Sequence, residues 1–160
     1  MRMPTVKGRS LAGSELDVPG GLAGSTNILL LAFHQWHQRD IDAWIGALGD
    51  AGIPTSPPHD EKGRATPESV PLVLYEIPMI GGRWQPFRGF IDGGMASSIK
   101  VPKILARTVT VYGQIGEVEK ALDLPDRRRV YAVVERDSQI LAIERGRPGD
   151  VDAIVRAALS

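Results

Sequence analysis

Apolar and polar positions along this chain follow two periodicities, one typical of buried strands and one typical of helices. Residues 26–33 form a nearly continuous apolar run, as expected for a strand that is covered on both faces. Apolar side chains then recur at helical spacing, because Ile41, Trp44 and Leu48 stand at i, i+3 and i+7. The pattern predicts a strand that runs directly into an amphipathic helix.

The same periodicities predict the other elements of the chain. We expect strands at 70–80, 108–112, 130–134 and 140–143, and helices at 84–99, 115–122 and 151–159. A glycine pair interrupts the pattern at 84–99, which favours two short helices there. Asp150 is a suitable N-cap for the last helix. Residues 1–25 are predicted to be an irregular lead-in, with a short edge hairpin as the alternative, and residues 54–69 to be a proline-rich loop.

The order of the predicted elements indicates an α/β fold. Strand–helix–strand units come first, and a turn-rich segment at 136–139 then joins the last two strands into an expected antiparallel hairpin before a closing helix. Such an order places helices on both faces of a mixed β-sheet, here of about four or five strands. The length of 160 residues suits a single domain over 1–160.

Charge and hydropathy narrow the classes of partner. Nineteen basic residues balance nineteen acidic ones, so no long-range field favours nucleic acid or anionic lipid. For the basic run at 127–129 we favour a solvated loop over a phosphate or nucleic-acid contact. The longest apolar run, 28–33, is far shorter than a transmembrane span, and residues 1–18 lack the apolar core of a signal peptide. We therefore expect a soluble, cytoplasmic protein without a transmembrane segment.

The chain contains no cysteine. This excludes disulfide bonds, thiolate catalysis and cysteine-ligated zinc within the chain. Thiol peroxidase, disulfide reductase and disulfide isomerase activities each need a thiol or selenol, so none of them is expected.

The polar junction between the first long strand and its helix is the main candidate site. Its candidate binding residues are His34, Trp36, His37, Gln38, Arg39 and Asp40. A helix N-terminus disfavours a protonated imidazole, so His37 is expected to be neutral and able to bind a metal or accept a proton.

A metal site at this junction is a weaker hypothesis. His34, His37 and Asp40 recur every three residues, and His59 or Asp60 would have to supply a further ligand from the proline-rich loop. Polar residues that satisfy backbone groups at a loop end are the favoured interpretation. We therefore expect no metal and no cofactor, and no catalytic residue is assigned.

A second candidate surface follows the strand at 70–80. Arg83, Trp84 and Met95 are residue types that are favoured at interface anchors, and they stand beside a glycine joint at 93–94. The alternative is that Trp84 and Met95, together with Phe87, fill the core under a long loop.

The layout around the junction resembles the thioredoxin-like fold, a three-layer α/β sandwich. In that fold the first core strand ends in an aromatic residue, and a redox motif follows a tryptophan at the helix start. Phe33 and Trp36 stand at these positions, and His37 and Asp40 stand where the two thiols would be. The cis-proline that normally faces the thiol motif is absent, because Arg129 or Val130 occupies its expected place.

Several short motifs also resemble the mitochondrial ATP synthase assembly-factor family and its bacterial relatives. They lie at 28–33, 42–44, 75–78, 90–95, 108–112, 122–124 and 130–143. The string Ile-Asp-Gly-Gly-Met at 91–95 is the most specific of them. Departures include Ala96-Ser97-Ser98, where an arginine-containing run is expected.

This resemblance implies a thioredoxin-like fold that serves protein assembly rather than thiol exchange. In the mitochondrial members the client is a membrane subunit of the ATP synthase proton channel. The predicted function is therefore a non-redox, chaperone-like binding or assembly protein with a protein client and no nucleic-acid partner; a homo-oligomer stays open. The alternative is a metal- or histidine-dependent enzyme that uses His34, His37 and Asp40.

Overall fold

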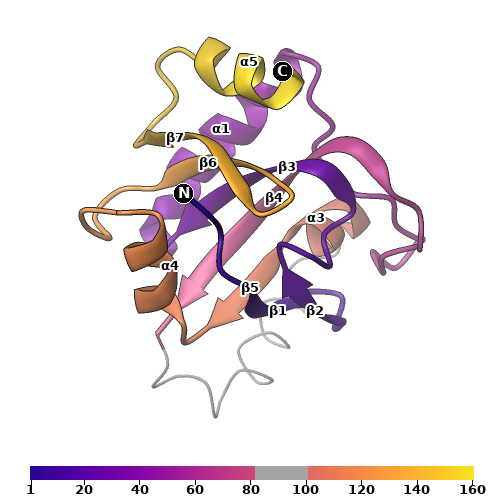
Figure 1. Ribbon diagram of the computed structural model, residues 1–160. Coiled ribbons are helices and arrows are strands. Elements are labelled where there is room, and N and C mark those ends of the chain that lie inside the picture. The colour runs from indigo at the N-terminus through magenta and orange to yellow at the C-terminus, as the bar shows by residue number, and fades with distance from the viewer. Residues whose placement is uncertain (82–100) are drawn as a thin grey trace.

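Seven strands form one mixed sheet in the computed structural model, which describes residues 1–81 and 101–160 (Figure 1). Their spatial order is β2-β1-β5-β4-β3-β6-β7. The strands are β1 (Val6–Ser10), β2 (Glu15–Val18), β3 (Gly24–Ala32), β4 (Val70–Ile80), β5 (Val109–Tyr112), β6 (Tyr131–Arg136) and β7 (Gln139–Arg145). The helical elements are η1 (Gln35–His37), α1 (Gln38–Asp50), α3 (Pro102–Arg107), α4 (Ile115–Ala121) and α5 (Asp152–Leu159).

Strand β3 is the centre of the mixed sheet. It pairs in parallel with β4 and antiparallel with β6, and β6 continues antiparallel to β7. Its side chains alternate between two buried clusters: Leu29 and Leu31 join one, and Ile28 and Leu30 join the other. This double burial explains the continuous apolar run in the sequence.

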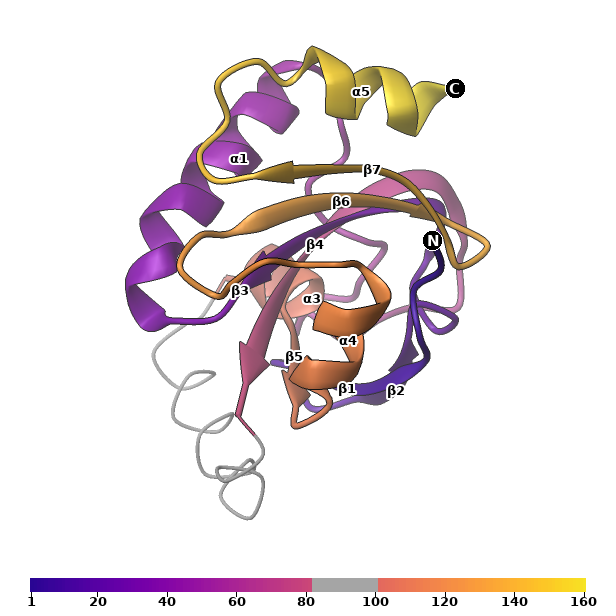
Figure 2. The same ribbon diagram turned by 60° about the vertical axis from the view of Figure 1, so that its left-hand side comes forward.

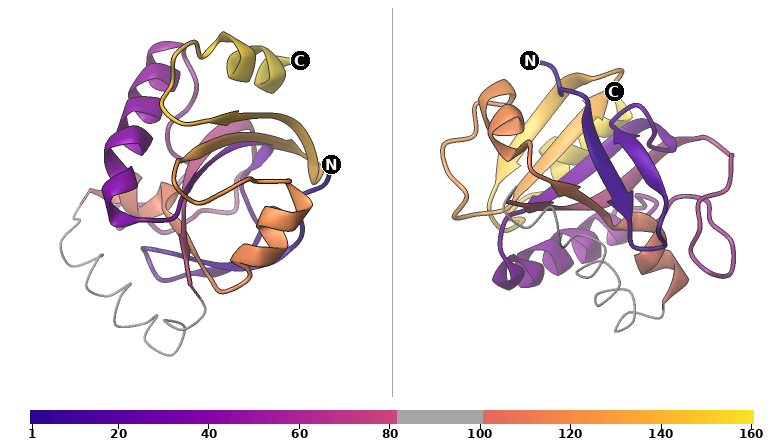
Figure 3. Two further views of the ribbon diagram at one scale, coloured as in Figure 1. Left: turned by 90° about the vertical axis from the view of Figure 1, so that its left-hand side faces the viewer. Right: turned by 90° about the horizontal axis from the view of Figure 1, so that it is seen from below.

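Helices cover both faces of the sheet and give three layers (Figure 3). Helices α1 and α5 pack on the face that holds Ile28 and Leu30, through apolar residues such as Trp44 and Ile154. Helix α4 packs on the opposite face through Val118, among others. In the described part of the chain, no helix is long and apolar enough to cross a membrane.

The sheet has seven strands rather than the predicted four or five, because the stretch 1–25 is not an irregular lead-in but contains the short edge hairpin given as the alternative. Strands β1 and β2 form an antiparallel hairpin there, and β1 also pairs with β5 at Gly8 opposite Val111. A Cβ atom at Gly8 would lie 2.6 Å from Cγ1 of Val109, so a glycine lets the two strands approach. Their short, largely polar sequences concealed them from a reading based on apolar runs.

The other boundaries need smaller corrections. Strand β4 covers the predicted 70–80, and the predicted hairpin is β6–β7. Helix α3 was not predicted, and the helices expected at 84–99 lie outside the described residues. The N-cap of α5 is Val151, one residue after the predicted Asp150. The Asp150 carboxylate nevertheless accepts a hydrogen bond from the Asp152 backbone amide at 2.9 Å.

A buried ion pair joins β4 to the end of α3. The Arg107 Nε donates to Oε2 of Glu76 at 2.8 Å, and the two side chains are only 9% and 8% exposed. The other carboxylate oxygen, Oε1, accepts from the Gln38 amide at 3.0 Å, which ties the first residue of α1 to the same strand. The pair therefore helps to fix where α1 begins.

We expect Arg107→Met to lower the free energy of unfolding by about 3 to 5 kcal/mol, because it leaves a buried carboxylate without its cation. The double variant Glu76→Leu/Arg107→Met should unfold at a higher urea concentration than Arg107→Met alone, since it buries no unpaired charge. The exposed Arg64–Asp60 pair provides a matched control, and Arg64→Met should leave the urea midpoint nearly unchanged. A double variant no more stable than Arg107→Met would contradict the charge argument.

Candidate functional site

The candidate site lies at the end of the sheet where β3 leads into α1 (Figure 2). The register places Leu31 of β3 opposite Tyr131, the first residue of β6, and Tyr131 opposite Arg145, the last residue of β7. The loop before β6, the loop after β7 and the β3–α1 junction therefore meet at the same end of the sheet. The junction is formed by residues 33–37, which include the short turn η1.

His37 is the structural centre of the junction. Its ring is buried, with 0% exposure; Nδ1 accepts a hydrogen bond from the Phe33 amide at 3.0 Å, and Nε2 lies 3.2 Å from the Arg128 carbonyl oxygen. Only a neutral ring with its proton on Nε2 can satisfy both partners, because an amide needs an acceptor and a carbonyl needs a donor. The side chain thus links the end of β3 to the loop before β6.

Burial is the main reason why the pKa of His37 lies below its ordinary value of 6.5. The hydrogen bond to Arg128 opposes this effect, and the nearby His34 and Arg129 add to it. The expected neutral ring is therefore found, although its leading cause is desolvation rather than the helix N-terminus on which the prediction relied.

Trp36 presents an aromatic surface to solvent beside this buried ring. It is 65% exposed, and its ring stacks on that of His34 at 5.4 Å between centroids and an interplanar angle of 5°. It also meets His37 edge-on at 4.3 Å. Five large apolar side chains are exposed among the described residues, and Trp36 is the aromatic one. The turn therefore holds an exposed indole against a buried and hydrogen-bonded imidazole.

Helix α1 holds the two neighbouring loops through one stripe of side chains. The stripe consists of His37, Asp40 and Trp44. The Asp40 carboxylate lies 3.4 Å from Nε of Arg147 and 3.9 Å from an amino group of Arg129. One turn later the buried indole of Trp44 donates to the Gly146 carbonyl at 2.7 Å. The stripe thus anchors the loop before β6 and the loop after β7 to the same helix.

The basic run at 127–129 is a solvated loop before β6, as predicted, and its backbone also bonds to the junction at Arg128. Arg127 pairs with Glu119 at 2.6 Å, and Arg128 pairs with Asp126 at 3.4 Å. Arg145 at the end of β7 reaches the same Asp126 at 3.0 Å. The Arg128 amide and the Arg145 guanidinium both lower the pKa of this aspartate.

The two predicted binding residues that directly follow the junction, Gln38 and Arg39, differ in their contacts. The Gln38 amide donates to Asp42 at 2.8 Å as well as to Glu76, so the side chain is fixed by two carboxylates although the residue is exposed. Arg39 is exposed. The other predicted binding residues, Arg83, Trp84 and Met95, lie outside the described part of the chain.

The predicted metal candidates do not converge. His34 stacks on Trp36, both nitrogens of His37 have partners, and Asp40 pairs with arginines. In the loop at 54–69, Nδ1 of His59 lies 2.8 Å from the Pro57 carbonyl, and Asp60 pairs with Arg64. Within 1–81 and 101–160, no three histidine or carboxylate side chains are grouped as metal ligands. These contacts give a metal site no support.

Solved structures of several thioredoxin-like proteins are similar to this chain over nearly its whole length. Etrx1, an exposed lipoprotein thioredoxin from Streptococcus pneumoniae, has a TM-score of 0.56 at 8% identity and covers 98% of both chains. BsSco, a member of the Sco family of cytochrome c oxidase assembly proteins, has a TM-score of 0.57 at 9% identity over 99% of this chain and 95% of its own. A putative thiol:disulfide interchange protein DsbE from Chlorobium tepidum has a TM-score of 0.51 at 10% identity over 99% and 93%.

These likenesses show the fold alone, and the chain has a thioredoxin-like α/β fold with no cysteine in it. No protein-family model matches the sequence, and no curated protein matches it. The resemblance to ATP synthase assembly factors is not shown by these comparisons.

The neutral state of His37 predicts a dependence of stability on pH. As the pH falls through 6.5, the unfolded chain gains a proton at His37 before the folded chain does, so the free energy of unfolding decreases. The decrease ends below the lowered folded-state pKa. The His37→Gln variant keeps a donor for the Arg128 carbonyl and has no titrating ring. Its urea midpoint should therefore change less than that of the wild type between about pH 7 and about pH 5.

His34→Gln is the matched control for this comparison, because the His34 ring is exposed, and most of the wild-type pH dependence should remain. An equal pH dependence in wild type and His37→Gln would contradict a neutral buried ring.

The absence of a side chain at Gly146 leaves the space that the Arg129 guanidinium occupies. Its φ is +87°, and a Cβ there would lie 2.8 Å from an amino nitrogen of Arg129. Gly146→Ala should lower the free energy of unfolding by about 1 to 2 kcal/mol from backbone strain alone and displace the guanidinium. Gly149→Ala is the control, because a Cβ at Gly149 would meet nothing within 4 Å. Urea unfolding of the two variants provides the measurement, and equal midpoints would contradict this reading.

Proposed function

We propose that this chain is a non-redox, thioredoxin-like binding protein of assembly or chaperone type, and that its client protein docks at the β3–α1 junction. The observation that carries the proposal is the exposed Trp36, held on the buried His37 at the place where related folds carry a redox motif. A tryptophan that is ordered yet exposed is a common interface anchor.

The rigidity of the turn supports a binding role. The His37 ring bonds to Phe33 within the junction and to Arg128 across the sheet edge. Gln38 fixes the start of α1 to Glu76. Because these contacts set the backbone before a partner arrives, docking would lose little conformational entropy.

The assembly aspect of the proposal is supported by two likenesses. The short motifs of the sequence resemble ATP synthase assembly factors in order and spacing, and that resemblance suggests a subunit of a larger complex as the client. BsSco, which shares the fold, is described as a member of an assembly-protein family. The absence of cysteine from this chain agrees with a role in which shape and contacts matter and thiol exchange does not.

A metal- or histidine-dependent enzyme is the less favoured function. A general base needs a free nitrogen within reach of its substrate. Nδ1 of His37 already accepts from Phe33, and Nε2 faces the Arg128 carbonyl.

Site-specific photo-crosslinking in the source cell tests the proposal. A benzophenone amino acid in place of Gln35, which is exposed, leaves Trp36 intact. We expect an adduct of defined mass from this position and none from the same probe in place of Leu159, which is 68% exposed on α5. Adding Trp36→Ala to the Gln35 probe should reduce the adduct by at least about fivefold, as expected for the loss of an interface anchor.

Competition gives the specificity control for this experiment. Excess wild-type protein without the probe should remove the adduct, and excess Trp36→Ala protein should not. The proposal fails if both probe positions give the same products, or if the Gln35 probe gives none.

A further inference from the structure

We propose that the surface formed by Trp36, Arg39, Arg128, Arg129 and Arg147 docks an acidic, extended segment of the partner protein. This inference rests on the proposed function, because it names the chemistry of the client that the junction receives. It joins two features that lie far apart in the sequence: the exposed indole of the junction and the arginine loops at the ends of β6 and β7. We call this set the arginine–tryptophan surface.

The positive charges of this surface face solvent, and the negative charges lie beneath them. The side chains of Arg128, Arg147 and Arg129 are 82%, 62% and 42% exposed. Asp40 and Asp126, which hold them, are only 16% and 22% exposed. A ligand that approaches from solvent therefore meets guanidinium groups before carboxylates.

The surface has more cations than its own anions can neutralise. Each half-buried aspartate is shared between two arginines: Asp40 between Arg129 and Arg147, and Asp126 between Arg128 and Arg145. With the exposed Arg39, five guanidinium groups face two carboxylates, which leaves an excess of three positive charges. Asp42, three residues after Arg39 on α1, accepts a hydrogen bond from the neutral Gln38 amide and keeps its negative charge, so the positive excess is two when Asp42 is counted as well.

The guanidinium groups keep hydrogen-bond donors for a ligand. Each has five N–H groups in a planar fork that matches a carboxylate. Arg147 approaches Asp40 through Nε at 3.4 Å, and Arg129 approaches it at 3.9 Å. The Arg147 contact uses Nε and the Arg129 contact a single terminal amino group at long distance, so an incoming carboxylate can pair with these guanidinium groups without displacing Asp40 from Arg147.

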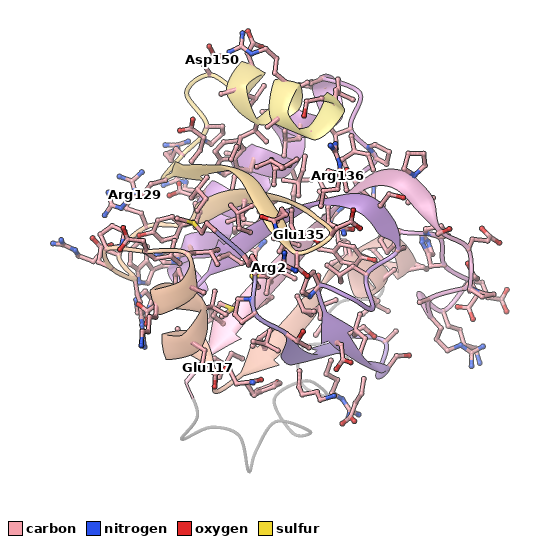
Figure 4. All side chains as sticks on the ribbon, viewed as in Figure 1. Arg2, Glu117, Arg129, Glu135, Arg136 and Asp150 are labelled. Atoms are coloured by element: carbon pink, nitrogen blue, oxygen red, sulfur yellow. The ribbon has the colours of Figure 1, made fainter. Side chains whose placement is uncertain are left out.

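The indole and the arginines belong to one continuous surface. Trp36 contacts His37 at 4.3 Å, and His37 bonds to the backbone of Arg128, the residue before Arg129. Figure 4 shows Arg129 at the margin of the molecule beside the start of β6, whereas Glu135 and Arg136 lie towards the other end of that strand. An extended segment that crosses the junction can thus place an apolar side chain on the indole and carboxylates on the arginines.

An acidic protein segment fits this surface better than nucleic acid or a membrane does. The chain as a whole has no net charge, so the long-range attraction that carries most nucleic-acid and lipid binding is small. The positive excess is confined to one rigid junction, where short-range pairs with carboxylates dominate. The neighbouring aromatic face also suits a mixed apolar and acidic sequence.

Fluorescence anisotropy with three defined probes tests the inference on the whole chain. The probes are a fluorescein-labelled peptide of alternating glutamate and leucine, its lysine–leucine counterpart, and a labelled single-stranded oligouridylate. Binding to vesicles with anionic phospholipids is measured by sedimentation. We expect binding of the glutamate peptide that weakens by at least about tenfold when the salt concentration rises from about 50 mM to about 200 mM.

Paired variants localise the binding to the proposed surface. Arg128→Ser/Arg147→Ser should weaken glutamate-peptide binding at least about tenfold while sparing the fold, because each aspartate keeps a second arginine. Lys62→Ser/Arg156→Ser removes the same charge from exposed positions elsewhere and should change the affinity by less than about twofold. Trp36→Ala should weaken binding as well. Thermal unfolding of each variant shows whether it is folded.

Each outcome separates the inference from the proposed function. Equal binding of the glutamate and lysine peptides, or no effect of Arg128→Ser/Arg147→Ser, overturns the acidic-segment inference. Tighter binding of the oligouridylate or the anionic vesicles through the same arginines also overturns it, in favour of that partner. Specific crosslinking from the Gln35 probe without glutamate-peptide binding would leave the proposed function intact and refute only the chemistry named here.

Discussion

The candidate site depends on one buried imidazole with two backbone partners. His37 accepts from the Phe33 amide and donates to the Arg128 carbonyl, so a single ring joins the end of β3, the start of α1 and the loop before β6. The ring can make both bonds only when it is neutral, and its burial keeps it neutral. Trp36, the loop before β6 and the first turn of α1 take their positions from this connection, and Asp40 and Trp44 of the same helix hold the loop after β7.

The β3–α1 junction is a preformed surface at the place where the thioredoxin-like fold carries its redox motif. In this chain the surface holds an indole and a set of guanidinium groups instead. Such groups bind by contact and charge, and they need no electron acceptor or donor. The exposed Trp36 is the feature of this surface on which the proposed role in recognition rests.

The sequence predicted the central elements well, because β3, β4 and α1 are long and strongly periodic. It gave β1 and β2 only as an alternative, because their four or five residues carry little apolar signal, and the pairing of β1 with β5 depends on the close approach at Gly8. The junction was found from its polar composition. The contribution of Arg147 could not be found that way, since only the register of β6 against β7 brings it to Asp40.

The sharing of each aspartate between two arginines has an evolutionary consequence. Because Asp40 and Asp126 each keep a cation when one of their arginines is lost, any single one of these four arginines can be exchanged without leaving a half-buried anion unpaired. Single substitutions can therefore change the charge of the proposed docking surface while the chain stays folded. The scaffold and its specificity are free to diverge at different rates.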